Sequence, residues 1–406
     1  MKRVLLGVWV AINIFCLAGC CEKPIPVVRN ERTVLIYMAA NNSLSQFSFS
    51  NIRSLIDGGF LPANGTILIY LDAPGQVPKL SRLVKNGELI EEEVIEQYSN
   101  EERATDPTVL TRTLNRIREI APADDYGLIL WSHATGWVPA RTFLSPIPSL
   151  QASFAPPIGY SVEDYPIVKS FAEGNRPGFG YDEGMEIDEL ADAIKSSSTP
   201  FSFLIFDCCL MGGIEALYAL RNVADYVIAS PTEILGNGFP YHLIMQPLFM
   251  PNPDLIGVCT SFYNFYNDLN GLNRSATISL YRTEPLLELA EYLTTLFDRY
   301  REDLELFSAV DIQRYANTRV YYDLDEFILQ LVNTADYQRF KTILDKIVLH
   351  KRHTEYFYTM VPPPSSAFIP VLHYGGISTY IPLSSQTSLL TAYKETEWNK
   401  KVKMVE

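Results

Sequence analysis

Cysteine, histidine and positive charge are all scarce in this sequence. Its 406 residues include only six cysteines and five histidines, and no pair of cysteines has the C-x-x-C spacing of a zinc site. Lys and Arg number 33 against 47 Asp and Glu, which gives a formal net charge of −14. Such an acidic chain would repel the phosphates of nucleic acid. The composition therefore disfavours both a structural zinc protein and a nucleic-acid-binding protein.

The first twenty residues are predicted to be a targeting segment. Lys2 and Arg3 precede an apolar stretch that ends in small residues, which is the layout of a secretory signal. The stretch is too short and wrongly flanked for a permanent membrane helix. Its end, Leu-Ala-Gly-Cys at 17–20, resembles a bacterial lipobox. We therefore expect a signal peptide over 1–19, a lipidated Cys20, a tether over 20–30 and a lipid-anchored location at the bacterial cell envelope, at the outer membrane or cell surface. An ordinary signal peptide cut elsewhere is the alternative.

The rest of the chain is typical of a large globular protein, with 47% hydrophobic residues. Short, continuously apolar runs alternate with amphipathic stretches, which predicts an α/β fold with a mainly parallel sheet covered on both faces. A hairpin is expected at Asn86-Gly87. The predicted strands are 33–39, 66–72, 126–132, 201–207, 225–230 and 276–281, and the clearest helices are 106–120, 185–197 and 213–222.

Two regions depart from this alternation. Residues 139–180 contain seven prolines and four glycines with no clear period, which is typical of a functional or processed loop. The chain after 283 begins with a helical pattern and includes a strand-like segment at 375–383. We predict a core over 31–283 and a dependent C-terminal subdomain over 284–406.

Two of the predicted strands end in residues suited to nucleophilic chemistry. One runs into His133, and the other runs into Asp207, Cys208 and Cys209. A His and a Cys on neighbouring strand ends can form a dyad whose thiolate attacks a carbonyl. Since side chains alternate along a strand, Asp207 and Cys209 should share one face and Cys208 the other. Alternation alone does not say which face carries a cleft.

The segments around these residues carry a family resemblance. They are "LILWSHATGW" (128–137), "LIFDCCLMGGIEALYAL" (204–220) and "ASPTEILGNGFPY" (229–241), with "TVLIYMAANNSL" near the start and "GGISTYIPL" near the end. Together they resemble the clostripain family of cysteine peptidases, peptidase family C11 of the caspase-like clan. The resemblance implies a caspase-like three-layer α/β sandwich and covers nearly the whole predicted mature chain.

The same resemblance implies roles for individual residues. Cys209 matches the nucleophile, which forms a thioester acyl-enzyme, and His133 matches the catalytic histidine. Asp207 matches the acidic residue of the primary specificity pocket, which favours Arg or Lys; the alternative for Asp207 is a helix cap. Cys208 falls on a variable position of the family pattern. The implied function is a cysteine endopeptidase that cleaves peptides and proteins after Arg or Lys.

One position departs from the family pattern. The residue after the histidine is usually Gly and is Ala134 here. Its backbone N–H, with that of Cys209, is implied to form the oxyanion hole. Alanine would fail there only if the site demanded a positive φ. This departure leaves open a non-catalytic, envelope-anchored binding protein of the same fold, and a transpeptidase is a second alternative.

The resemblance also bears on processing and cofactors. It suggests self-cleavage in the 139–180 loop, where the basic residues are Arg141, Lys169 and Arg176. Some members of the family use calcium, but no acidic cluster here demands it, so we expect neither a cofactor nor a metal site. Ser230 and Glu233 could line the cleft or serve a turn, and Glu215 is expected to be structural.

Overall fold

A nine-stranded mixed sheet forms the centre of the protein. The structure is a computed structural model and describes residues 30–139, 184–360, 367–383 and 385–406. The strand order is β10-β8-β7-β6-β5-β1-β2-β3-β4. The five strands from β7 to β2 are mutually parallel, and the strands at either edge are antiparallel to their neighbours. The strands are β1 (Asn30–Ala39), β2 (Gly65–Asp72), β3 (Lys79–Asn86), β4 (Leu89–Gln97), β5 (Ala123–Trp131), β6 (Phe201–Asp207), β7 (Ala224–Ala229), β8 (Thr277–Arg282) and β10 (Val348–His353).

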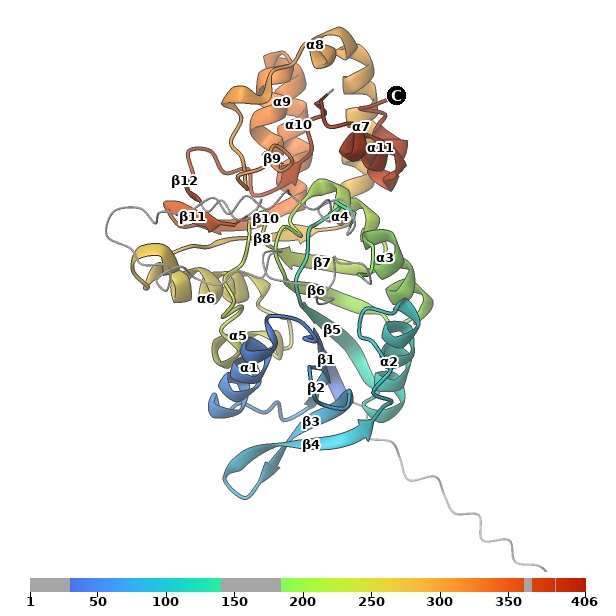
Figure 1. Cartoon of the computed structure of the whole chain (residues 1–406), viewed down its shortest axis with the longest axis vertical. Helices are drawn as coiled ribbons and strands as arrows, with labels where there is room; N and C mark the ends of the chain where they lie inside the picture. Colours follow the sequence, from blue (N-terminus) through green and yellow to red (C-terminus); the bar gives the residue numbers. More distant parts are fainter. Residues whose placement is uncertain (1–29, 140–183, 361–366, 384) are drawn as a thin grey trace, which may run out of the picture.

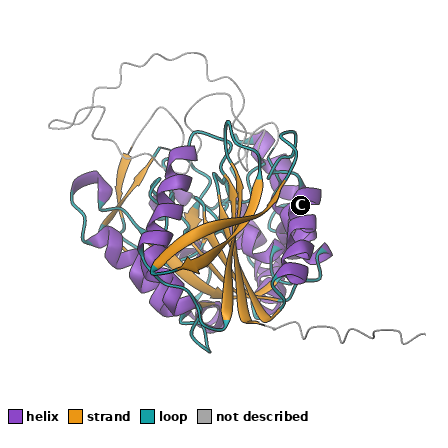
Figure 2. Ribbon diagram, turned by 90° about the horizontal axis from the view of Figure 1, so that it is seen from below, coloured by secondary structure: helices purple, strands orange, loops and turns teal. Residues whose placement is uncertain are grey.

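Helices cover both faces of this sheet, so the molecule has three layers (Figures 1 and 2). One face carries α1 (Ser45–Asp57), α5 (Tyr241–Leu248) and α6 (Leu255–Asn267), which pack against one another. The other face carries α2 (Pro107–Ile120), α3 (Ile187–Ser196) and α4 (Ile214–Ala219). This cover explains why the central strands are continuously apolar rather than alternating. The predicted α/β class with a mainly parallel sheet is confirmed.

Local sequence signals account for the ends of several elements. The Asp106 carboxylate accepts the Thr108 N–H at the start of α2, where Pro107 supplies the first helical residue. The turn between β3 and β4 places Gly87 at φ +63°, which glycine adopts without strain. The hairpin predicted at Asn86-Gly87 is therefore present.

The C-terminal part of the chain is joined to the core sheet by β10, which pairs with β8. The predicted strand over 375–383 is wrong in its extent, because only Ser378 and Thr379 form a strand, β13, which pairs with β9. The following N–H, that of Tyr380, is donated to the Glu215 side chain instead of to a strand. The remaining elements are α7 (Leu286–Arg299), α8 (Arg301–Glu305), β9 (Tyr322–Asp323), α9 (Leu324–Leu331), α10 (Thr334–Ile347), β11 (Tyr356–Thr359), β12 (Ala367–Pro370), β13 (Ser378–Thr379), α11 (Thr387–Glu395), α12 (Glu397–Val402) and the 3-10 helices Gly271–Asn273 and Ala309–Asp311.

Several sequence-based expectations fall largely or wholly outside the described residues. These are the signal peptide, Cys20, almost all of the tether and nearly all of the 139–180 loop with its three basic residues. The boundary at 283 stays a prediction. Within the ranges that the structure describes, no helix is both long enough and apolar enough to cross a membrane.

Candidate active site

Three loops meet at the carboxyl end of the parallel sheet, following β1, β5 and β6. The chain passes from β1 to β2 on one side and later places β5 on the other side of β1. Open α/β sheets bind ligands at such a switch in strand order. The loop after β1 carries Ser43, the loop after β5 carries His133, and the loop after β6 carries Cys208 and Cys209. The fold therefore gathers His133, Cys208 and Cys209, which the sequence singled out, at the carboxyl ends of the parallel strands.

His133 and Cys209 each lie two residues beyond the end of neighbouring parallel strands. In the β5–β6 pair, Trp131 lies opposite Asp207 as the last pair of the ladder, and His133 and Cys209 follow these two residues at the same spacing. Nε2 of His133 lies 3.0 Å from Oγ of Ser43, just ahead of α1, which puts the imidazole on the α1 face of the sheet. His133 is largely buried.

The two cysteines point to opposite faces, as strand alternation requires. The sulfur of Cys209 accepts the Ile234 N–H at 3.1 Å and lies 3.5 Å from the Ile234 carbonyl oxygen, in the loop before α5. The sulfur of Cys208 instead donates to the Leu130 carbonyl oxygen at 3.2 Å and faces α3. Only Cys209 therefore shares a face with His133.

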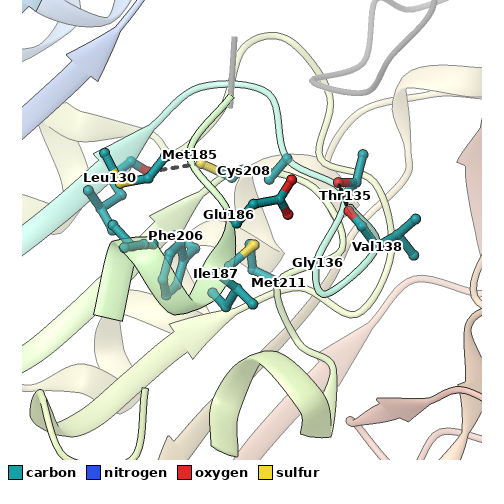
Figure 3. Close-up of a pocket in the computed structure, with 12 residues that line it drawn as sticks. Leu130, Thr135, Gly136, Val138, Met185, Glu186, Ile187, Phe206, Cys208 and Met211 are labelled. Carbon is teal, nitrogen blue, oxygen red and sulfur yellow. Dashed lines mark hydrogen bonds between the residues drawn. The ribbon is translucent and has the colours of Figure 1, made fainter. Parts of the chain in front are cut away.

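A small cavity lies under Cys208 on the α3 side (Figure 3). Its volume of about 30 Å³ is room for one water and not for a peptide side chain. The lining is mostly apolar, with Cys208 at its edge. This cavity is not a substrate pocket, and Cys208 behaves there as a small core residue. Its lining residues are Leu130, Ala134, Thr135, Gly136, Val138, Met185, Glu186, Ile187, Leu190, Phe206, Cys208 and Met211.

Asp207 is a fully buried carboxylate on the same face as Cys209. Its Oδ2 accepts hydrogen bonds from the Tyr241 hydroxyl at 3.0 Å and from the Phe239 N–H at 3.3 Å. Burial, followed by the charges of Asp207 and Cys209, raises the pKa of Tyr266 well above its usual value. Asp207 and Cys209 therefore lie near the same buried tyrosine. Phe239 and Tyr241 precede and begin α5, so these two donors to Asp207 do not belong to the helix after Cys209.

The backbone at Ala134 needs no glycine. Among the described residues other than glycine, only Ser198, Leu210 and Lys403 have a positive φ, so φ at Ala134 is negative. The left-handed position of this loop falls at Gly136, where φ is +65°. A Cβ built on Gly136 would lie 2.6 Å from the Leu210 carbonyl oxygen. The loops that carry His133 and Cys209 therefore come into close contact at Gly136.

Three further residues contact this region, and sequence reasoning did not assign them to it. Tyr241 holds Asp207, and the buried hydroxyl of Tyr321 donates to the Thr135 carbonyl oxygen at 2.8 Å. Glu215 was expected to be structural, and its Oε1 accepts the Tyr380 N–H at 2.8 Å and the Thr379 hydroxyl at 3.0 Å. These partners are distant in sequence, and no local pattern marks them.

Two polar side chains near the loops, Ser230 and Glu233, were left open by the sequence. Glu233 is buried and its Oε2 accepts the Met360 N–H at 2.8 Å, while the Ser230 hydroxyl lies 2.7 Å from that of Thr277. These contacts tie the loop after β7 to β8 and to the residue that follows β11. In the part of the chain that the structure describes, no group of three or more His, Cys, Asp or Glu side chains could hold a metal ion.

Comparison with known proteins defines the class of this molecule. A model of the clostripain family matches residues 36–146 and 174–403, so the chain belongs to that family and is a cysteine peptidase. A comparison with curated protein sequences finds no match. The family and the caspase-like three-layer fold expected from the sequence are confirmed.

Among the solved structures that resemble the chain are three peptidases. An inactive zymogen C11 protease from Parabacteroides distasonis is 33% identical, with a TM-score of 0.77 over 93% of this chain and 99% of that one. A secreted C11 cysteine protease from Bacteroides thetaiotaomicron, in complex with an irreversible peptide inhibitor, is 26% identical, with a TM-score of 0.74 over 92% and 99%. A clostripain from Bacteroides thetaiotaomicron in complex with the peptide inhibitor BTN-VLTK-AOMK is 28% identical, with a TM-score of 0.50 over 57% and 99%.

Proposed function

We propose that this peptidase is an endopeptidase that cleaves after Arg or Lys, with Cys209 as nucleophile and His133 as acid–base. One observation carries the proposal: His133, Asp207 and Cys209 lie toward one face of the central sheet, whereas Cys208 points to the other face. A nucleophile, a base and a basic-side-chain receptor on one face can act on a single bound peptide.

The chemistry follows from these positions. The thiolate of Cys209 attacks the scissile carbonyl carbon, and a C–S bond forms while the carbonyl oxygen takes the negative charge. Backbone N–H groups of Ala134 and Cys209 would stabilise that charge. His133 then gives its proton to the leaving amine as the C–N bond breaks, which leaves a thioester. Water attacks the thioester, His133 accepts a proton from it, and the C–S bond breaks to release the acid.

Asp207 supports the specificity for basic side chains. Its buried carboxylate is an acceptor for charge-assisted hydrogen bonds from an ammonium or a guanidinium group. The Bacteroides thetaiotaomicron clostripain binds a peptide inhibitor whose peptide portion, VLTK, ends in lysine. A similar preference in this chain would follow from Asp207 at the pocket floor.

The arrangement also supports a latent form. Asp207 and Cys209 have no exposed surface, so a peptide reaches neither of them without a rearrangement. A relative with 33% identity is an inactive zymogen. We therefore propose activation by cleavage in the 139–180 loop, at Arg141, Lys169 or Arg176. A single intact chain in the mass spectrum of fully active protein would refute this step.

The negative φ of Ala134 supports a catalytic protein over a non-catalytic one, because the alanine N–H could take the place of the glycine N–H.

We further propose that Cys20 is acylated and anchors the enzyme to the envelope, which fits the secreted relatives. Metabolic labelling with a radioactive fatty acid should mark the protein and should not mark a Cys20→Ala variant.

The deciding experiment measures hydrolysis of fluorogenic peptides that differ only in the residue before the scissile bond: Arg, Lys, Asp, Asn or Leu. The full chain is tested before and after trypsin nicking, with and without calcium, in the presence of a reductant. Cleavage confined to Arg and Lys, lost in Cys209→Ala and kept in Cys208→Ala, is expected. Absence of cleavage under every condition would overturn the proposal.

A further inference from the structure

One oxygen of the Asp207 carboxylate is held by hydrogen bonds from the fold itself. Of the two oxygens of Asp207, Oδ2 accepts two hydrogen bonds from this chain itself, one from the Tyr241 hydroxyl and one from the Phe239 N–H. A carboxylate oxygen has about two lone-pair sites in the carboxylate plane. Both acceptor sites of Oδ2 are therefore engaged before any substrate arrives.

Both donors are held by well-packed parts of the fold. Tyr241 is fully buried at the first position of α5, which packs against α1 and α6. The Phe239 N–H follows Gly238, whose carbonyl oxygen accepts the Tyr266 hydroxyl at 2.7 Å. Burial and the Asp207 carboxylate raise the pKa of Tyr241 well above its usual value, so its hydroxyl remains a donor at neutral pH. Displacing either donor would leave a buried polar group without an acceptor, which is unfavourable.

Lysine and arginine make different demands on such a carboxylate. Guanidinium binds best as a fork, with one N–H to each carboxylate oxygen. Ammonium is a compact point charge that needs only one oxygen and can direct its other protons elsewhere. We propose that Tyr241 is a specificity-determining residue that makes this enzyme prefer lysine over arginine. The inference rests on the proposed function, in which Asp207 receives the basic side chain.

The test compares kcat/KM for two peptides that are identical except for Lys or Arg before the scissile bond. Three activated full-length proteins are compared: wild type, Tyr241→Phe and Tyr37→Phe. The last is a matched control, because it also removes the hydroxyl of a fully buried tyrosine, but one that bonds the Ala104 carbonyl oxygen and not Asp207. We expect wild type and Tyr37→Phe to favour lysine by about tenfold, and Tyr241→Phe to bring the ratio close to one.

The outcomes separate this inference from the proposed function. Equal ratios in all three proteins, or a wild type that favours arginine, would overturn the role of Tyr241 while cleavage after basic residues still stood. Failure to cleave after either residue would overturn the proposed function, and this inference with it.

A second measurement needs no variant. n-Butylamine and n-butylguanidine are compared as competitive inhibitors of the wild-type enzyme, and the amine should have the lower inhibition constant. Tighter binding of the guanidine would overturn the inference even if Tyr241→Phe failed to fold.

Discussion

Tyr321 and Thr135 lie 186 positions apart in the chain, and the Tyr321 hydroxyl donates a 2.8 Å hydrogen bond to the Thr135 carbonyl oxygen. Thr135 is two residues after His133, so the C-terminal part of the chain holds the histidine loop directly. Nearby, the Ser378 N–H donates to the Gly212 carbonyl oxygen at 2.9 Å, in the loop that follows Cys209. The C-terminal region therefore contacts both loops of the proposed dyad, which is a physical reason for it to be inseparable from the core.

Replacing Tyr321 with Phe should weaken catalysis more than substrate binding. The ring would still fill its buried site, but the Thr135 carbonyl would lose its donor and the His133 loop would be held less firmly. We expect kcat to fall about tenfold with KM changed by less than about threefold, since small misplacements of catalytic groups are costly. Steady-state kinetics on a Lys or Arg peptide measures both constants.

Tyr292→Phe is the matched control for this variant. That buried hydroxyl donates to the Asp336 carbonyl oxygen in the C-terminal region. It should leave kcat unchanged. Equal loss of kcat in the two variants would show a general effect of losing a tyrosine hydroxyl and would contradict a specific role for Tyr321.

Replacing Gly136 with Ala should separate the two catalytic loops. The new Cβ would lie 2.6 Å from the Leu210 carbonyl oxygen and would sit on a residue with φ of +65°. We expect activity to fall by about a hundredfold or more, because one loop must move. Gly75→Ala carries the same φ penalty of about 1 kcal/mol at +71°, with nothing within 4 Å of the new Cβ. The control should lose stability but keep its activity, and equal activity in the two variants would contradict the prediction.

The sequence predicted the central strands well because their signal is local. A run such as Phe-Leu-Ile-Phe at 203–206 is continuously apolar, and this is the pattern that a strand covered on both faces requires. Strand alternation also predicted that Cys208 and Cys209 would face opposite layers. The segment 375–383 has the sequence of a strand but forms no long one, since its backbone groups pair with Gly212, Glu215 and a two-residue strand rather than with a regular sheet.

The remaining features of the site depend on contacts between distant segments. Nothing local distinguishes Tyr241, which bonds Asp207, from the other 23 tyrosines of the chain. The sequence could not decide whether alanine is acceptable after His133. The answer depends on which residue of the loop has a positive φ, and that residue is Gly136. Long-range register and loop geometry decide these points.

Separate replacement of Cys208 and Cys209 tests which cysteine is catalytic and which only packs in the core. Cys209→Ala should abolish cleavage after basic residues, because Cys208, the other cysteine of the pair, faces the opposite side of the sheet. Cys208→Ala should keep kcat/KM within about threefold but lower the free energy of unfolding by about 1–2 kcal/mol, since it removes a hydrogen bond and enlarges the cavity beside α3. Urea unfolding and peptide hydrolysis measure the two properties separately. Loss of activity in Cys208→Ala with intact folding would contradict the assignment.

Glu215 should lower the free energy of unfolding as the pH rises, which is opposite to the usual effect of a carboxyl group. Burial raises its pKa to about 7, an effect that the hydrogen bonds from the Tyr380 N–H, the backbone at Glu215 and the Thr379 hydroxyl only partly oppose. A carboxyl group with a raised folded-state pKa binds its proton more tightly in the folded protein. The stabilising contribution of protonated Glu215 to the free energy of unfolding is therefore fully present below about pH 4.5 and is lost as the pH rises through about 7.

Glu215→Gln removes this titration while keeping the shape and an acceptor oxygen for Tyr380. Relative to wild type, the variant should gain up to about 3 kcal/mol in unfolding free energy between pH 4.5 and pH 8, because wild type alone must hold a buried carboxylate at the higher pH. Urea unfolding of both proteins across that pH range measures the difference. Glu397→Gln, at a half-exposed carboxylate paired with Arg221, serves as the control for replacing a carboxylate by an amide at the surface. A stability difference between wild type and Glu215→Gln that stays constant with pH would mean that the buried group does not titrate there.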